Sequence, residues 1–322
     1  MDSKELRIVF MGTPEFAASS LRRLVEEGYN VAAVVTAPDK PAGRGQKLHE
    51  SDVKRYAAGA GIPVLQPEKL RDPEFLEQLR AIDADLGIVI AFRMLPEAVW
   101  AMPRLGTFNL HASLLPQYRG AAPINRAIIN GETVTGLTTF MLNAEIDKGD
   151  IIGRVEMPIL PSDNAGTLHD RLMETGTELV TLTVDRIAEG NVTPLSQMDI
   201  PENTLKPAPK IFKDDCRVDW TISGREIADL IRGLSPYPAA WSAMYDGDGS
   251  ETGSLKIFDG RFTGTQHGAE PGTVDFSDRN ALRVACADGW IAVTDLQPAG
   301  KRRMTAAEFL NGWQRPQRLI LK

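Results

Sequence analysis

Asn109 and His111, at the end of a short apolar stretch, are the first residues whose types and spacing could do chemistry. They are two positions apart, so on an extended backbone their side chains project to the same face. The carboxamide of Asn109 can donate a neutral N–H to a developing oxyanion. The imidazole of His111 can give or take a proton near neutral pH. Taken alone, such a pair is more often structural than catalytic, so the residues around it have to decide.

The elements that must position this pair are predicted to form a doubly wound, mostly parallel, Rossmann-like sheet. A strand, a glycine turn, a helix and a second strand follow one another between residues 6 and 36, as at the start of such a sheet. Residues 86–92 add a nearly continuous apolar strand, which parallel sheets require. Between them, residues 37–48 lack periodicity and predict an exposed loop. Residues 116–123, rich in proline and glycine, also predict a loop and no helix.

The rest of the chain predicts a linker and a second domain. A long helix opened by Thr167 ends the first predicted domain, residues 1–189. Residues 190–209 lose periodicity and hold four prolines, which indicates a linker. Residues 210–322 contain one predicted helix and several short strands separated by Gly and Asp. This pattern favours a small β-barrel, for which an oligonucleotide-binding-type barrel is one candidate.

Composition restricts the classes of function. The 43% hydrophobic and 25% charged content is ordinary for a globular protein, and the longest apolar run is too short to span a membrane. Two cysteines, Cys216 and Cys286, cannot build a disulfide framework or a metal cluster, and they favour the reducing cytoplasm. The net charge of −7 gives no global sign of a nucleic-acid partner. In the less acidic C-terminal part, residues 301–303 are the one basic cluster, and a solvated turn explains them equally well.

The whole stretch around the pair resembles the signature of the folate-dependent formyltransferases. Asn109-x-His111 is followed by Ser-Leu-Leu-Pro at 113–116 and Arg-Gly at 119–120, and Asp147 stands where that family has its acid. The resemblance implies 10-formyltetrahydrofolate as formyl donor and no metal. It implies that Asn109 stabilises the tetrahedral oxyanion, that His111 is a general acid or a second donor, and that Asp147 orients His111 or relays a proton. The expected folate-binding residues are Ser113, Leu114, Leu115, Pro116 and Arg93.

Within the family, the resemblance runs almost end to end with members that formylate methionyl-initiator tRNA. Residues 40–45 resemble their tRNA-gripping insertion, and residues 207–211 resemble their linker. The expected tRNA-binding residues are therefore Lys40, Arg44, Lys47 and Lys210, and Phe16 is expected in the methionyl pocket. Residues 235–241 and 296–312 resemble the C-terminal domain of these members. We expect a cytoplasmic monomer without membrane attachment.

Other interpretations stay open at this point. Arg93 and Arg126 replace residues that many family members carry, and Arg93 is reminiscent of formyltransferases acting on sugar nucleotides. Enzymes acting on glycinamide ribonucleotide share the site. They usually have a glycine-rich phosphate loop that is absent from this chain, and they lack its C-terminal domain. A hydrolase that passes the formyl group to water would use the same three residues. A non-catalytic RNA-binding module would apply only if Asn109 and His111 are structural.

Overall fold

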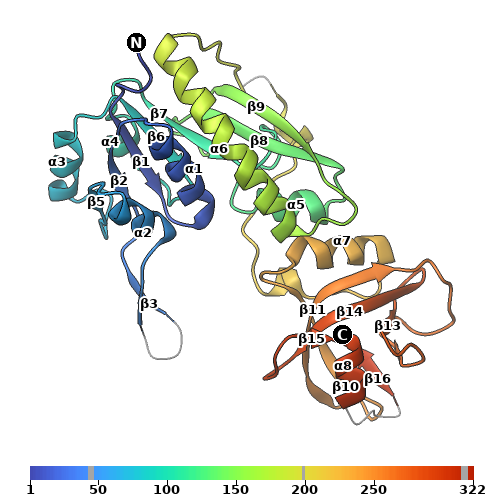
Figure 1. Cartoon of the computed structure of the whole chain (residues 1–322). Coiled ribbons are helices and arrows are strands. Elements are labelled where there is room, and N and C mark those ends of the chain that lie inside the picture. Colours follow the sequence, from blue (N-terminus) through green and yellow to red (C-terminus); the bar gives the residue numbers. More distant parts are fainter. Residues whose placement is uncertain (43–46, 198–199, 313–317) are drawn as a thin grey trace. The chain divides into compact units, whose positions relative to one another are not determined.

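The chain folds into two compact units (Figure 1). The computed structural model describes residues 1–42, 47–197, 200–312 and 318–322. The N-terminal unit consists of residues 1–120, 136–157 and 170–207, and the C-terminal unit of residues 121–135, 158–169 and 208–322. Residues 121–135 and 158–169, two short segments that precede residue 208, are thus grouped with the C-terminal unit. The division predicted from sequence, at residues 189 and 209, stays a prediction.

The N-terminal unit is built on a seven-stranded sheet with the order β5-β2-β1-β6-β7-β8-β9. Its strands are β1 Ile8–Gly12, β2 Val31–Val35, β5 Val64–Leu65, β6 Leu86–Ile90, β7 Thr107–His111, β8 Val134–Met141 and β9 Ile151–Pro158. Neighbours from β5 to β7 pair in parallel, and β8 pairs antiparallel with β7. The predicted doubly wound, mostly parallel sheet is confirmed.

Helices cover both faces of this sheet. They are α1 Glu15–Glu26, α2 Asp52–Gly59, α3 Pro73–Ala81, α4 Glu97–Trp100 and, from residue 170 onward, α6 Ala165–Glu189. On one face, Val9 and Val89 of the sheet pack with Phe75 of α3 and Val99 of α4. On the other face, the hydroxyl oxygens of Thr139 in β8 and Thr183 in α6 lie 2.9 Å apart. The sheet core is therefore closed on both sides, and the ends of its strands are left to carry polar residues.

Local structure departs from the sequence prediction in three places. The predicted loop at residues 37–48 contains two short strands in its described part: β3 Lys40–Ala42 and β4 Lys47–His49 pair as an antiparallel hairpin. Backbone pairing needs no apolar pattern, so these strands have no periodic signal in the sequence. A helix that was not predicted, α5 Pro123–Ile129, begins where proline is favoured as the first helical residue. Helix α6 begins before Thr167, because the Asn164 side chain accepts a hydrogen bond from the Thr167 N–H (3.0 Å).

The C-terminal unit is a nearly closed antiparallel barrel, as predicted. Its strands are β10 Ala240–Asp246, β11 Glu251–Phe262, β12 Val274–Asp275, β13 Leu282–Ala285, β14 Trp290–Pro298, β15 Met304–Thr305 and β16 Leu319–Leu321. The strand order is β12-β13-β14-β11-β10-β16, and a bridge between Thr273 and Ile320 joins the two ends. Its core is lined by apolar residues of the strands and of helices α7 Gly224–Leu234 and α8 Ala306–Gly312.

Helix α7 shows how the sequence positions this barrel. Ser223 and Glu226 form a capping box at its start, which satisfies free backbone N–H groups. Ile227 and Ile231 project into the barrel core at helical spacing. The side chain of Asn125 in α5 donates a hydrogen bond to the carbonyl of Gly233 (2.7 Å), so α5 is tied to α7. Two short 3₁₀ turns, Glu202–Thr204 and Asp214–Cys216, lie on either side of residue 209. Among the described helices, none combines the length and apolar character that a membrane span requires.

Candidate active site

The site is built on the C-terminal end of β7. Asn109 pairs with Val89 of β6 on one side and with Phe140 of β8 on the other, so its backbone is fixed within the sheet. Its side chain is only partly buried. Within the part of the chain that the structure describes, the Asn109 carboxamide has no hydrogen-bond partner. A carboxamide on a fixed backbone whose N–H donors are free can bind the oxygen of a ligand.

His111, two residues further on, is held by one ring nitrogen. The side chain is buried, with 7% exposed, and its Nε2 lies 2.8 Å from the carbonyl oxygen of Tyr118. A carbonyl only accepts, so Nε2 carries the hydrogen and donates it. The other nitrogen, Nδ1, lies 3.9 Å from Oδ2 of Asp147. Proton exchange by His111 is therefore left to Nδ1.

Asp147 reaches His111 from the segment between β8 and β9. Its backbone is left-handed, with φ of 53°, and its Oδ2 accepts a hydrogen bond from the Gly120 N–H (2.9 Å). Nearby Gly149 allows this segment to pass close to β8, since a Cβ there would lie 1.6 Å from the carbonyl oxygen of Met141. The structure thus brings together all three residues predicted to be catalytic: Asn109 and His111 along one strand, and Asp147 beside His111.

The predicted folate-binding segment follows directly. Ser113 is fully buried, and its hydroxyl donates to the carbonyl of Gln117 (2.6 Å). Leu115 is also fully buried and packs with Phe140 and Ile151. Leu114 and Pro116 are partly exposed, and the peptide bond between Leu115 and Pro116 is cis. Two side chains of the segment therefore anchor it, and the other two are accessible.

Arg93 and Phe16, two more predicted site residues, lie elsewhere in the N-terminal unit. Arg93 follows β6, and its guanidinium donates to the carbonyl oxygens of Glu68 (2.8 Å) and Pro67. Removal from water lowers the pKa of Arg93 below its ordinary value. Phe16 lies in the first turn of α1, with 7% of it exposed. Both predicted roles, at the folate edge and in a methionyl pocket, stay predictions.

Comparison with known proteins decides the family. The formyl transferase model matches residues 6–184, and the model of the formyl transferase C-terminal domain matches residues 210–314. The chain belongs to the formyl transferase family. This confirms the resemblance drawn from the residues around Asn109.

One relative of this formyltransferase matches it over nearly its full length. A methionyl-tRNA formyltransferase of Bacteroides fragilis is 54% identical over 314 residues, which cover 97% of each chain. Among solved structures, the sugar 3N-formyl transferase WlaRD, crystallised with dTDP and 5-N-formyl-THF, aligns with a TM-score of 0.65. It is 19% identical, over 92% of this chain and 99% of its own. HypX from Aquifex aeolicus in complex with tetrahydrofolic acid aligns with a TM-score of 0.64. It is 17% identical, over 99% of this chain and 51% of its own. At these identities the two structures show a shared fold.

The residues predicted to bind tRNA lie on both units of the formyltransferase. Lys40 is exposed at the start of the β3–β4 hairpin, Lys47 belongs to β4, and Arg44 lies outside the described residues. The root of the hairpin is held by Asp39, whose carboxylate pairs with Lys54 and accepts from Gln66 (2.8 Å).

Lys210 belongs to a basic and aromatic group of the C-terminal unit that the sequence analysis did not single out. Its Nζ lies 5.5 Å from the ring of Phe212, which is 63% exposed. Lys213 and Arg217 lie 5.4 and 5.6 Å from the ring centre of Trp241. Basic residues interleaved with aromatics are the sequence signal that could have found this group. We call these five residues the Trp241 surface.

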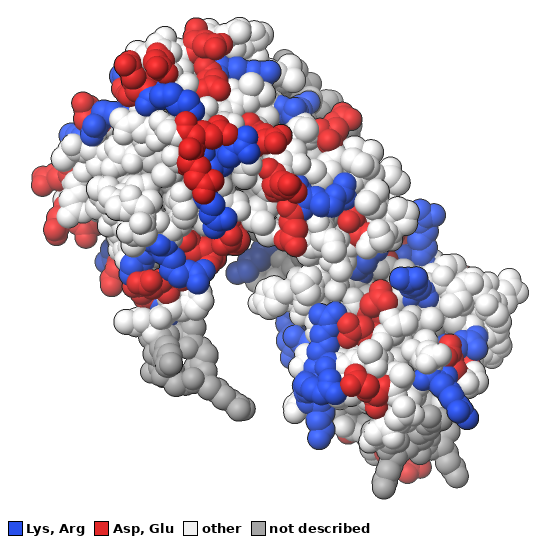
Figure 2. Space-filling model, in the orientation of Figure 1, with Lys and Arg blue, Asp and Glu red and all other residues white. Residues whose placement is uncertain are grey.

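The Trp241 surface differs in charge pairing from residues 301–303. Within the described chain, its lysines and Arg217 have no carboxylate partner. Arg303 instead makes a forked pair with Asp295 (2.5–3.0 Å), and Arg302 pairs with Glu308 (2.7 Å). Figure 2 shows Lys and Arg side chains gathered along one side of the C-terminal unit. Unpaired cations are the ones available to an anionic partner.

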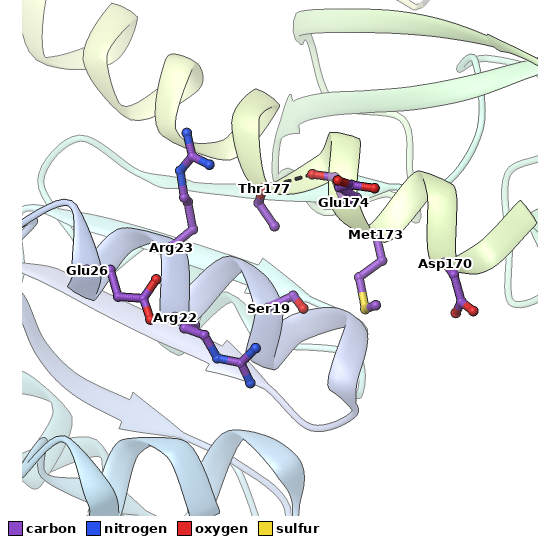
Figure 3. Close-up of a pocket in the computed structure, with 8 residues that line it drawn as sticks. All are labelled: Ser19, Arg22, Arg23, Glu26, Asp170, Met173, Glu174 and Thr177. Carbon is purple, nitrogen blue, oxygen red and sulfur yellow. Dashed lines mark hydrogen bonds between the residues drawn. The ribbon is translucent and has the colours of Figure 1, made fainter.

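A groove of about 380 Å³ between α1 and α6 contains none of the predicted site residues (Figure 3). Arg22 and Arg23 line it from α1, and Asp170 and Glu174 line it from α6. Both arginines are already paired, Arg22 with Glu15 of α1 and Arg23 with Glu27, directly after this helix. Among the described residues that line it, the groove therefore offers no free cation for a substrate phosphate.

The sequence analysis also missed Gln197, in the predicted linker. Its side chain is 2% exposed, yet it contacts both the Asp147 segment and Arg119. A glutamine in a segment without periodicity gives no sequence signal of such contacts. Within the described residues, no group of three or more His, Cys, Asp or Glu could hold a metal ion.

Proposed function

We propose that this formyltransferase transfers the formyl group of 10-formyltetrahydrofolate to the α-amine of methionyl-initiator tRNA. The single observation that carries the choice of acceptor is the 54% identity to a methionyl-tRNA formyltransferase over 97% of both chains. The site geometry supports formyl transfer, and the Trp241 surface supports an acceptor that contains nucleic acid. We also expect the enzyme to be a cytoplasmic monomer.

The reaction needs an oxyanion donor and a route for one proton. The amine nitrogen forms a bond to the formyl carbon, and the carbonyl oxygen gains the negative charge of a tetrahedral intermediate. When this intermediate collapses, the bond from the formyl carbon to N10 of the folate breaks. The proton lost by the amine has to reach N10 for the charges to balance.

Asn109 would stabilise the oxyanion. Its backbone is fixed between β6 and β8, and its carboxamide is not engaged by any described residue. A donor held in place before the reaction stabilises charge as it forms and costs no reorganisation. A single donor of this kind lowers the activation barrier by roughly 3–4 kcal/mol.

His111 and Asp147 would carry the proton. Nε2 of His111 is engaged by Tyr118, so Nδ1 is the nitrogen that exchanges the proton, and it faces Asp147 at 3.9 Å. A proton taken by Nδ1 gives an imidazolium beside a carboxylate, a favourable charge arrangement. The imidazolium can also act as a second donor to the oxyanion. Such proton transfer typically contributes about 10²–10⁴-fold to the rate.

The donor would lie along residues 113–116, whose partly exposed Leu114 and Pro116 can contact a flat ring. Arg93 would stand at the folate edge. Its guanidinium is fixed by two backbone carbonyls, so any contact with folate would use its remaining N–H groups.

The tRNA would contact both units. In the N-terminal unit, Lys40 and Lys47 belong to the paired strands β3 and β4. Together with Arg44, which lies outside the described residues, they would neutralise phosphates of the acceptor end. In the C-terminal unit, the Trp241 surface offers cations and two aromatic rings. Phosphates bind the cations, and an unpaired base can stack on a ring.

The test measures formyl transfer from 10-formyltetrahydrofolate to three acceptors: methionyl-initiator tRNA, a dTDP-linked amino sugar and water. Rapid transfer to the charged tRNA, with the other two at background, is the expected result. Transfer to the amino sugar at a higher kcat/KM would replace the proposal by a sugar formyltransferase. Folate deformylation without any acceptor would replace it by a hydrolase.

A further inference from the structure

Gln197 is a buried polar side chain with every hydrogen-bonding group engaged. Its Nε2 donates to the carbonyl oxygens of Gly149 (2.6 Å) and Asp147 (3.2 Å). Its Oε1 accepts from Nη2 (2.9 Å) and Nε (3.3 Å) of Arg119. With 2% of the residue exposed, water cannot replace these partners. Gln197 therefore bridges two segments that are far apart in the sequence.

The two bridged segments together position the Asp147 carboxylate: one contains Asp147 itself, and the other contains Gly120, to which the carboxylate is hydrogen-bonded. On the side of residues 145–150, Gln197 binds the backbone of Asp147 itself. On the other side it binds Arg119, whose neighbour Gly120 donates its N–H to Oδ2 of Asp147 (2.9 Å). The Gln197 side chain thus fixes the backbone of Asp147, and through Arg119 it also fixes the backbone of Gly120, which donates a hydrogen bond to the Asp147 carboxylate.

Asp147 needs such support because its backbone is left-handed. A φ of 53° is unfavourable in a residue other than glycine and persists only where surrounding contacts impose it. Gly149 fits against the Met141 carbonyl only without a side chain, so the segment is tightly constrained. The carbonyl oxygens that Gln197 binds belong to these same two residues.

Small displacements at this point matter for the chemistry. The separation of 3.9 Å between Oδ2 and Nδ1 of His111 is longer than a hydrogen bond. A shift of about 1 Å decides whether a proton can pass directly, and misplacement of that size can lower a rate by about 100-fold.

We propose that Gln197 is a positioning residue, which sets the distance between the Asp147 carboxylate and Nδ1 of His111. This inference rests on the proposed role of Asp147 in proton transfer. Gln197 itself is expected to touch neither substrate. It acts through the backbone of Asp147 and through Arg119.

The decisive variant is Gln197→Glu, which keeps size and the contact with Arg119 but replaces the N–H donors by oxygen. Two carbonyl oxygens would then face a carboxylate, and the Asp147 segment should move away. We expect kcat to fall by about 10- to 100-fold, with the KM for the folate donor within about twofold of the parent value. The matched control is Gln297→Glu in the C-terminal barrel. Gln297 donates one comparable bond, 2.8 Å, to the carbonyl of Lys301.

A double-mutant cycle separates positioning from a general structural role. If Gln197 acts through Asp147, adding Gln197→Glu to Asp147→Asn should cost less than about threefold beyond Asp147→Asn alone. If the two losses multiply, Gln197 supports the fold and the inference is overturned. Full activity in Asp147→Asn would instead overturn the proposed role of Asp147, so the two failures are distinguishable.

A readout that does not use activity covers the case of an unstable variant. The chain has four histidines, so NMR signals of their ring nitrogens can be assigned one by one. In the folded full-length Gln197→Glu protein, or in Arg119→Ala if the former does not fold, the His111 signals should shift. The signals of His49, His169 and His267 should stay in place. An unchanged His111 spectrum in a folded variant contradicts the inference.

Discussion

At the scale of single residues, the candidate chemistry of this formyltransferase is divided between two groups: the Asn109 carboxamide, which is free of described partners, and the His111 imidazole, which is held by a hydrogen bond. The Asn109 carboxamide is engaged by no described residue, whereas His111 gives Nε2 to Tyr118 and keeps Nδ1. The free group suits an oxygen that arrives with the substrate. The held group suits a proton that moves along a fixed direction toward Asp147.

Removing the free donor tests the first half of this division. For Asn109→Ala we expect kcat to fall by about 10²–10³-fold, because the oxyanion loses its fixed donor. The KM for the folate donor should change far less, since the contact strengthens only in the transition state. Steady-state kinetics with methionyl-initiator tRNA measures both values. Asn280→Ala, at an exposed position of the barrel, is the control. Asn109→Ala with more than about a tenth of the parent kcat would contradict the role.

Asp85 is a second residue whose surroundings make a prediction, here about acid stability. Burial alone would raise its pKa, but hydrogen bonds from the Arg7 N–H (2.8 Å) and the Arg104 side chain (2.6 Å) outweigh it, and the pKa lies below its ordinary value. A lowered folded-state pKa means that the unfolded chain binds the proton more readily. The stabilisation is therefore present above about pH 4 and is lost as the pH falls through the folded-state pKa.

For Asp85→Asn we therefore expect a loss of stability on the order of 1 kcal/mol at pH 7. The loss should shrink as the pH drops below about 4, where the parent protein also loses its charge. Urea unfolding at a series of pH values measures this difference. A difference that stays constant down to pH 3 would show that packing, and not charge, is responsible.

At the scale of elements, the segment between β8 and β9 is a part of the site that tolerates little change in side-chain size. It carries Asp147 past β8, and Gly149 touches the Met141 carbonyl so closely that no side chain fits. Because the opposing atom belongs to the backbone, it cannot rotate away. The fold around Asp147 thus depends on a glycine that does no chemistry.

We expect Gly149→Ala to destabilise the N-terminal unit by at least about 3 kcal/mol, at the upper end for overpacking. Gly59→Ala is the control, because Gly59 lies in α2 with no atom near its missing Cβ. That change should stabilise by up to about 1 kcal/mol, since alanine favours helix. Chemical denaturation of both variants measures the difference. Parent-like stability of Gly149→Ala would show that the segment can move away from β8.

The sequence was sufficient for elements with a strong apolar pattern. The strands around Val9 and Val89 were predicted, because strands buried on both faces of a parallel sheet form nearly continuous apolar runs. The helix with Ile227 and Ile231 was also predicted, and these two residues repeat at helical spacing. The hairpin that begins at Lys40 was missed, because the backbone hydrogen bonds between its strands require no apolar pattern in the sequence.

The candidate site was predictable to a similar extent. Asn109 and His111 follow from strand alternation, and Asp147 followed only from a family resemblance. Gln197 could not be predicted, because a hydrogen bond between residues so far apart in the chain leaves no local pattern. The free state of Nδ1 on His111 also required the structure, since it depends on where the Tyr118 carbonyl lies.

At the scale of the whole molecule, the question is how an enzyme with a net charge of −7 binds a polyanion. The proposed answer is local: cations of the hairpin in one unit and of the Trp241 surface in the other. Elsewhere, arginines such as Arg302 and Arg303 are paired with carboxylates and are already neutralised. Free cations, rather than the total number of cations, should determine the salt dependence of binding.

The salt dependence of tRNA affinity tests this idea. Each phosphate neutralised on duplex nucleic acid contributes about 0.9 to the slope of log K against log salt. We expect Lys213→Ala and Arg217→Ala each to lower the slope by up to about one unit, because neither cation has a described carboxylate partner. Lys40→Ala should do the same from the N-terminal unit. If both units hold one tRNA, the slope changes of Lys40→Ala and Lys213→Ala should add in the double variant.

Arg302→Ala, which removes a cation already paired with Glu308, is the matched control and should leave the slope nearly unchanged. Fluorescence titrations of initiator tRNA at several salt concentrations measure these slopes. Equal slopes for the Lys213→Ala, Arg217→Ala and Arg302→Ala proteins would exclude the Trp241 surface as a phosphate-binding site.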